Sequence, residues 1–290
     1  MGGMPRLRKL LNATLTASGR LKRALLGERL RLANHPHLLQ LYERLVRLGR
    51  VEEVEIHGHR LRLDPLDSMH LSLHGRYEEG ETRFVQQRVR PGDVVFDVGA
   101  HVGYFTLLFA RGVGPGGRVF AFEPHPDNRA LLVHNLAANG YANVEVSAAA
   151  VARADGHATL YASLDNTGDN ALHGQGPGFT VETRALDGYC EQARGKRAFF
   201  KLDTQGHELD VFAGAHELFA ACAEVTVLFE FWPHGLRQAG RDPREVFRVQ
   251  DELGFAGHTL DDAGRLQPLD PDALLASLQG EAFSTVVWTR

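Results

Sequence analysis

Two glycines and an acidic residue stand at a spacing that suits the binding of a nucleoside ligand. The segment Asp97–Gly103 (DVGAHVG) follows an apolar run that ends at Phe96 and precedes a second apolar run. This order predicts a buried strand, a tight turn and a helix, and ligands bind at the carboxyl ends of such strands in open parallel sheets. Gly99 and Gly103, which carry no Cβ, would let a ligand approach the backbone closely. Asp97 would present a carboxylate to a cationic or hydroxyl-rich group.

A second acid follows at the distance expected for a ribose contact. The next predicted strand ends in Phe122-Glu123-Pro124, and Glu123 lies twenty residues beyond Gly103. A carboxylate in this place accepts hydrogen bonds from both hydroxyls of a ribose. We expect Ala100, His101 and Pro124, which flank these positions, to contact the same ligand.

A dinucleotide cofactor is the main alternative. Oxidoreductases that use nicotinamide or flavin dinucleotides hold the pyrophosphate with Gly-x-Gly-x-x-Gly at a helix N-terminus. Here three residues separate Gly99 from Gly103, and the carboxylate of Asp97 would repel a pyrophosphate. The pattern therefore favours an adenosine that carries an amino acid.

Strand-like and helix-like segments alternate through the middle of the chain. This alternation predicts a mainly parallel, doubly wound α/β sheet with helices on both faces. The chain ends differently, in two strand-like runs without a helical crossover of comparable strength, and we expect the last strand to insert antiparallel. The expected strands are Val94–Phe96, Val119–Phe122, Val144–Val146, Phe199–Leu202, Val225–Phe231, Ala256–Leu260 and Ser284–Trp288, and the clearest expected helices are Pro126–Asn139 and Glu208–Ala220.

The first part of the chain differs in charge and pattern. Residues 1–50 hold eleven Lys and Arg against Glu28 and Glu43, a net charge of +9, which leaves −13 on the rest of a chain of formal charge −4. Leucines at helical spacing predict short helices up to Leu48, and a β-hairpin is predicted around His57-Gly58-His59. We therefore expect an N-terminal helical and β-hairpin cap over residues 1–80 and one main domain over 81–290.

The basic segment suggests partners but does not identify one. It would suit an acidic protein or a membrane surface, nucleic acid is less expected, and a solvated helical face is the alternative. No apolar run is long enough to cross a bilayer, the N-terminus lacks the apolar core of a signal peptide, and two cysteines cannot form a disulfide framework. We expect a cytoplasmic protein that acts on a small hydroxylated molecule and can form a homo-oligomer.

Four blocks in order resemble the FkbM family of methyltransferases, from about Tyr77 to Pro233. The blocks are Tyr77-Glu78 with Arg90–Tyr104, then Phe122-Glu123-Pro124, then Lys201–Glu208 with Phe212–Ala215, and Phe229-Glu230-Phe231. The resemblance implies a class I methyltransferase (Rossmann-like) fold with a seven-stranded sheet, S-adenosylmethionine as the methyl donor, and S-adenosylhomocysteine as the product. It also implies methylation of a hydroxyl, most often on a sugar, a polyketide or another secondary metabolite. The family commonly has Glu at Gln205 and a small residue at His207.

The acceptor-side chemistry is expected at the ends of the fourth and fifth strands. Asp203 and Lys201 point to the same side because strand side chains alternate, so they form a plausible ion pair beside the sulfonium. His207 is a chemically apt general base, and Glu230 is a candidate for acceptor contact or for the base. Each of these four residues also has a purely structural alternative role.

Three further residues complete the expected cofactor contacts. Ala149 and Ala150, just after the third strand, are expected to line the adenine, and Glu78 to reach the methionine end. We expect no metal, because no histidine pair has the spacing that a zinc helix requires. The polar loop Asp165–Asn170 is expected to cover the acceptor, with binding of an ion as the alternative. N-methylation of an amine, a nicotinamide-dependent oxidoreductase and a non-catalytic binding protein remain as alternatives.

Overall fold

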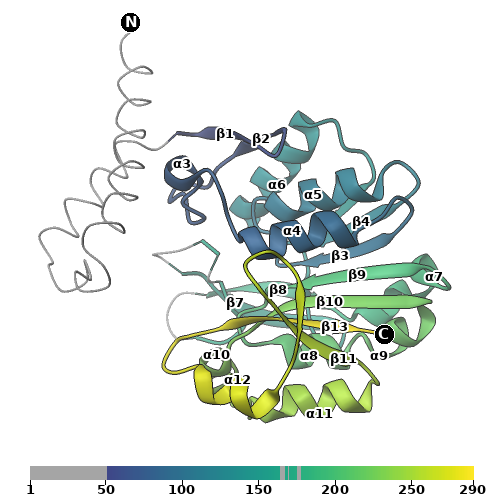
Figure 1. Ribbon diagram of the computed structural model, residues 1–290. Coiled ribbons are helices and arrows are strands. Elements are labelled where there is room, and N and C mark those ends of the chain that lie inside the picture. Colours follow the sequence, from purple (N-terminus) through teal and green to yellow (C-terminus); the bar gives the residue numbers. More distant parts are fainter. Residues whose placement is uncertain (1–50, 164–166, 169, 175–177) are drawn as a thin grey trace, which may run out of the picture. The chain divides into compact units, whose positions relative to one another are not determined.

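The computed structural model describes residues 51–163, 167–168, 170–174 and 178–290 (Figure 1). Backbone contacts divide the chain into two compact units, Met1–Tyr77 and Glu78–Arg290. The predicted boundary after residue 80 falls inside helix α4 (Glu79–Arg88). The basic segment and its predicted helices lie outside the described residues.

The described part of the first unit is a small hairpin with one helical turn. Strands β1 (Glu53–Ile56) and β2 (His59–Arg62) pair antiparallel, as predicted, and α3 (Leu71–His74) follows. His57 and Gly58 both have positive φ, which is the backbone of the two-residue turn that matches strand twist. No helix in the described ranges is both long and apolar enough to span a membrane.

The second unit is built around one eight-stranded sheet. Its order is β12-β11-β13-β10-β9-β3-β4-β5, with the five strands from β10 to β5 parallel and β13 antiparallel to both of its neighbours. The doubly wound α/β class and the antiparallel last strand are confirmed, and the short edge strand β12 adds one strand to the seven expected. The bounds are β3 (Val94–Val98), β4 (Arg118–Phe122), β5 (Val144–Ser147), β9 (Arg197–Leu202), β10 (Glu224–Phe231), β11 (Ala256–Leu260), β12 (Leu266–Pro268) and β13 (Ser284–Thr289).

Helices cover both faces of this sheet (Figure 1). On one side lie α4, α5 (Tyr104–Val113) and α6 (Pro126–Ala138), and on the other α8 (Glu208–Ala213), α9 (His216–Ala221) and α11 (Arg244–Glu252). The remaining described helices of this unit are α7 (Cys190–Ala193), α10 (Pro233–Gln238) and α12 (Pro271–Ser277).

The single helix predicted over Glu208–Ala220 is wrong, because α8 and α9 are separate helices. A Cβ at Gly214 would lie 2.3 Å from the carbonyl oxygen of Ala152, so the chain turns where only glycine fits. The carbonyl of Gly214 also accepts a hydrogen bond from the N–H of Asp187 at 2.8 Å. Tertiary contacts thus interrupt a pattern that is helical by sequence alone.

A small three-stranded sheet, which was not predicted, follows β5. Strands β6 (Ala150–Val151), β8 (Gly178–Arg184) and β7 (Gly156–Tyr161) form it, with β6 parallel and β7 antiparallel to β8. Buried Ala150, Leu160 and Val181 make its small core.

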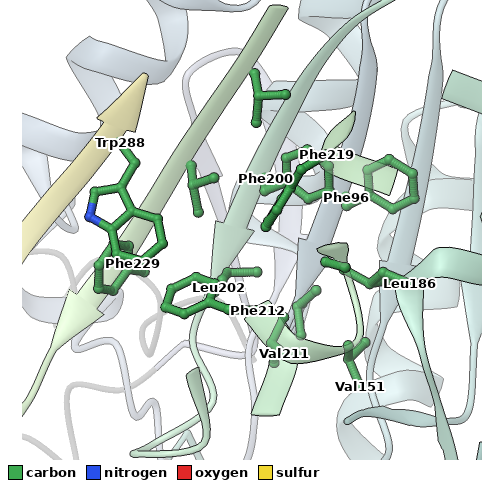
Figure 2. Packing of buried hydrophobic residues seen from close by; sticks show 14 of the residues in the cluster. Phe96, Val151, Leu186, Phe200, Leu202, Val211, Phe212, Phe219, Phe229 and Trp288 are labelled. Carbon is green, nitrogen blue, oxygen red and sulfur yellow. The ribbon is translucent and has the colours of Figure 1, made fainter. Parts of the chain in front are cut away.

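Alternation of side chains along the strands separates the apolar core from the polar face. On β9, Ala198, Phe200 and Leu202 belong to the core cluster that packs on α8 and α9 (Figure 2). Phe199 and Lys201 point the other way, where Phe199 contacts Phe109 of α5 and the Lys201 ammonium contacts an α5 ring. The α5 face of the sheet therefore carries the polar residues at the strand ends.

Replacing Phe200 by alanine should strongly destabilise this unit. Phe200 is fully buried, stacks on Phe96 at 4.8 Å between ring centroids and meets Phe219 edge-on at 5.0 Å. The loss of these contacts and the resulting cavity should lower the free energy of unfolding by about 3–5 kcal/mol, measured by urea denaturation. Val133→Ala, at an exposed position on α6, is the control and should change stability by less than about 0.5 kcal/mol. Equal effects of the two changes would contradict this packing.

Candidate active site

Charged side chains gather at the carboxyl ends of four neighbouring strands. Glu123 follows β4, Asp97 lies near the end of β3, Asp203 follows β9, and Glu230 lies near the end of β10. These strands are adjacent in the order β4-β3-β9-β10, and Asp97 pairs in register with Lys201. The structure therefore brings together the acids that the sequence placed at separate strand ends.

Asp97 is buried and only partly satisfied. The residue is 1% exposed, and its Oδ2 accepts a hydrogen bond from the Thr106 hydroxyl at 2.5 Å. Its Oδ1 has no hydrogen-bond partner among the described residues. Burial raises the pKa of Asp97 to about 6, although the Lys201 ammonium and the Thr106 hydrogen bond act in the opposite direction. The buried Oδ1 therefore keeps an acceptor position that no described residue fills.

Lys201 and Asp203 form the ion pair that the sequence suggested. The Lys201 Nζ lies 3.4 Å from the Asp203 Oδ2 and 4.8 Å from the centre of the Phe105 ring. Burial alone would lower the pKa of Lys201, but attraction to Asp203, Glu78 and Asp97 outweighs it and raises the pKa. Lys201 is thus held as an ammonium ion and is unsuited to act as a base.

The other oxygen of Asp203 is held by a neighbour in the same loop. The Gln205 side-chain amide donates a hydrogen bond to the Asp203 Oδ1 at 2.8 Å. Gln205 has a positive φ of 51°, which turns its side chain back on the strand end. Gln205, which departs from the family pattern, therefore orients the carboxylate beside Lys201.

Glu230 extends the acidic row onto β10. It is half-buried and faces Thr285 across the β10–β13 pair. Burial, with repulsion from Asp203, Glu78 and other carboxylates, raises the pKa of Glu230 well above its ordinary range. Glu78, at the N-cap of α4, therefore lies close enough to act on both Glu230 and Lys201.

Glu123 joins the loops that follow β3 and β4. Its Oε2 accepts a hydrogen bond from the His101 N–H and its Oε1 one from the His125 N–H, each at 2.8 Å. Burial raises the pKa of Glu123 to about 7, despite these two donors. Each carboxylate oxygen keeps a further acceptor position, so the geometry leaves Glu123 able to accept ribose hydroxyls.

The two glycines of the DVGAHVG loop are required by packing within the protein. Gly99 has φ 81°, and a Cβ there would lie 2.2 Å from the Asp203 carbonyl oxygen. Gly103 has φ 94°, and a Cβ there would lie 2.6 Å from the Leu132 side chain. The loop is therefore pressed against the β9 end and α6, while its approach to a ligand stays a prediction.

The remaining predicted cofactor residues lie around this loop. Ala100 is buried, and its N–H shares the Phe122 carbonyl with the N–H of Gly99. The carbonyl of Pro124 accepts a hydrogen bond from Arg129. Ala149 is buried just after β5, whereas Ala150 packs into the core of the small sheet. Their contact with an adenine stays a prediction.

His207 has a partner that the sequence did not reveal. Its Nε2 lies 3.1 Å from the Nδ1 of His173, and its Nδ1 lies 3.5 Å from the Asp210 Oδ2. Burial and the neighbouring His207 lower the pKa of His173. A lone histidine in a polar loop gives no sequence signal for this, because 34 residues separate the two rings in the chain.

The segment that carries His173 also touches the DVGAHVG loop. The Thr167 hydroxyl lies 2.9 Å from the His101 Nε2, and the Thr167 carbonyl accepts a hydrogen bond from the Asn128 side chain. Of the predicted cover loop, residues 165–170, residues 165–166 and 169 lie outside the described residues. Thr167 of this loop contacts the DVGAHVG loop, and His173, just beyond it, contacts the loop after β9.

Comparison with known proteins identifies the family. The family model for the methyltransferase FkbM domain matches residues 97–256, more than half of the chain. This protein belongs to the FkbM methyltransferase family. The match includes the DVGAHVG loop, Glu123, the Lys201–Asp203 pair and Glu230.

Similarity to individual proteins is local or distant. The 31-O-demethyl-FK506 methyltransferase FkbM of Streptomyces tacrolimicus is 57% identical over 47 residues, which cover 16% of this chain and 18% of that protein. The hexuronic acid methyltransferase AglP of Haloferax volcanii is 23% identical over 209 residues, 71% of this chain and 82% of that protein. A solved structure of an FkbM methyltransferase from Methylobacillus flagellatus KT aligns with 77% of this chain and 53% of that chain, at 12% identity and a TM-score of 0.42.

Asp97→Asn should reduce the loss of stability that occurs as the pH rises. Because the pKa of Asp97 is about 6 when folded and about 4 when unfolded, the folded protein binds more protons between these values, and stability falls as the pH rises through them. This group alone should cost on the order of 2–3 kcal/mol, and the variant should lack that loss. Urea denaturation at about pH 4 and about pH 7 measures the difference.

The control is Asp251→Asn, at an exposed position on α11. It should lose stability with pH just as the unchanged protein does. Parallel losses in Asp97→Asn and the unchanged protein would contradict the burial of an unsatisfied carboxyl at this position.

Proposed function

We propose that this FkbM-family protein is an S-adenosylmethionine-dependent O-methyltransferase acting on a hydroxylated sugar, polyketide or similar small molecule. The observation that supports it best is the row of Glu123, Asp97, Asp203 and Glu230 along adjacent strand ends, with a buried oxygen of Asp97 left without a hydrogen-bond partner among the described residues. The family match and the named activities of its relatives, which methylate FK506 precursors and hexuronic acids by their descriptions, support the same class.

The residues present suit this cofactor chemically. Glu123 would accept the ribose hydroxyls, and the unpartnered Oδ1 of Asp97 would accept from the ligand's ammonium group. A pyrophosphate would instead meet a surplus of carboxylates, which disfavours a dinucleotide. When bound, S-adenosylmethionine supplies an electrophilic methyl group on a positively charged sulfur.

The acceptor proton requires a base, and the His207–His173 pair is the best placed. Lys201 is held as an ammonium ion, and Asp203 is engaged by Lys201 and Gln205. Asp210 contacts the Nδ1 of His207 and is itself fixed by Arg153 at 3.1 Å. The imidazole pair would take the proton that the acceptor hydroxyl loses as its oxygen bonds to the methyl carbon.

Binding of S-adenosylhomocysteine, and not of NAD, is the first expected result. Calorimetric titration measures both and needs no knowledge of the acceptor. Asp97→Ala and Glu123→Ala should each weaken S-adenosylhomocysteine binding by on the order of tenfold or more, because each removes a charge-assisted hydrogen bond. Asp203→Ala should mainly lower kcat. Binding of NAD alone would overturn the proposal, and unchanged affinity in Glu123→Ala would contradict the ribose assignment.

His173→Ala and His207→Ala should each lower kcat by on the order of 100-fold, because each removes a member of the proton-accepting pair. The assay is transfer of a labelled methyl group to an acceptor found by screening hydroxylated metabolites. In the unchanged protein, kcat should rise with pH. The midpoint of this rise should lie below the ordinary histidine pKa, because burial and His207 lower the pKa of His173. His216→Ala, at an exposed position on α9, is the control. Full turnover in His173→Ala would exclude the pair as the base.

A further inference from the structure

The group of side chains at the strand ends holds more acidic than basic residues. The carboxyl groups of Asp203, Glu78 and Asp97 raise the pKa of Lys201. Lys201, Asp203 and Glu78 also act on Glu230. Lys201 pairs directly with Asp203. One ammonium cannot balance this group of carboxyls, so the strand ends favour a further positive charge.

Glu230 is the carboxyl of this group that the protein satisfies least. Asp97 accepts a hydrogen bond from Thr106, and Asp203 is bound by Lys201 and Gln205. The carboxyl group of Glu230, in contrast, makes no hydrogen bond or ion pair with any described residue. Thr285, which faces it from β13, gives its hydroxyl hydrogen bond to Glu81.

The groups packed around Glu230 explain its state in the unliganded protein. Asp203 and Lys201 reach it from β9, Glu78 from the start of α4, and Glu208 from α8. Burial and the three acids raise its pKa, and only Lys201 acts against them. Glu230 therefore keeps its proton near neutral pH until a positive charge is placed beside it.

We propose that Glu230 is the residue by which this site distinguishes the cationic methyl donor from the uncharged product. The inference rests on the proposed function. S-adenosylmethionine and S-adenosylhomocysteine share the adenine, the ribose and the amino acid, and differ in one methyl group and one positive charge. Glu230 attracts the charged sulfur before transfer and loses that attraction once the sulfur is neutral, which favours release of the product.

Comparing the two ligands isolates this effect from the other titrating groups. Asp97 and Glu123, whose pKa values are also raised, would contact parts that both ligands contain. Their contributions therefore cancel in the ratio of the two dissociation constants. A change in that ratio reports on a group that responds to the sulfonium charge alone.

The test is calorimetric titration of the full chain with S-adenosylmethionine, S-adenosylhomocysteine and sinefungin, for the unchanged protein and Glu230→Gln. Sinefungin carries a charged amino group where the donor carries its methyl sulfonium, so it reports charge without methyl transfer. In Glu230→Gln the two cationic ligands should bind about tenfold more weakly, while S-adenosylhomocysteine should bind within about twofold of its original affinity. Glu252→Gln removes a carboxyl group from an exposed position on α11. It should leave the ratios of the ligands' dissociation constants unchanged.

A second measurement uses only the unchanged protein, and so does not depend on the variant folding. Titrations in buffers of different ionisation heat measure the protons released on binding. Because a bound cation lowers the pKa of Glu230, the cationic ligands should release more protons than S-adenosylhomocysteine, and their affinity should rise more steeply with pH above neutrality.

The outcomes separate this inference from the proposed function. If neither S-adenosylmethionine nor S-adenosylhomocysteine binds the unchanged protein, the proposed function fails and this inference fails with it. If both bind with equal proton release, or if Glu230→Gln weakens both equally, the inference alone is overturned. Selective weakening of the cationic ligands supports it.

Discussion

The buried ammonium of Lys201 is the interaction on which the candidate site depends. Asp97 and Asp203 lie on adjacent strands about 5 Å apart, where two carboxylates repel each other strongly once water is excluded. Lys201 pairs in register with Asp97, and its ammonium contacts the Asp203 carboxylate and the ring of Phe105. Without this charge, the acids at the ends of β3 and β9 would be buried and uncompensated, which is strongly unfavourable.

The apolar core fixes the place of this ammonium. Phe200 and Leu202 pack on α8 and α9, so Phe199 and Lys201 must face α5. A shift of one residue in the register of β9 would move Lys201 into the apolar cluster. The stacked rings of Phe96 and Phe200 therefore hold the register that places Lys201 beside Asp97. The packing of the apolar core and the position of Lys201 therefore both depend on the alternation of side chains along β9.

The acidic groups at the strand ends influence one another electrostatically. Raised pKa values at Asp97, Glu123 and Glu230 have burial as their first cause. Such groups cost stability in the unliganded protein, and a cationic ligand would offset part of that cost. Destabilised, incompletely satisfied groups are typical of binding sites, because their interactions are completed by the ligand.

Most of the sheet and half of the site could be predicted from sequence, because both depend on local pattern. Continuous apolar runs marked β3, β4, β9 and β10, and acids directly after them must lie at one edge of a parallel sheet. Alternation along a strand put Lys201 and Asp203 on one face. The same local reasoning predicted one helix over Glu208–Ala220 and did not detect β12 or the small sheet. These depend on contacts such as Gly214 against Ala152, which no local pattern contains.

The sequence by itself determined which residue types stand at each strand end and on which face they lie, because side-chain direction repeats every second residue. Only the tertiary structure decided which polar groups have hydrogen-bond or ion-pair partners. His173 contacts His207, Gly99 approaches the Asp203 backbone, and Thr285 donates its hydroxyl hydrogen bond to Glu81 rather than to Glu230. Each of these contacts joins distant parts of the chain. Burial and hydrogen bonding are properties of the packed chain, so the state of each charge was set by the fold.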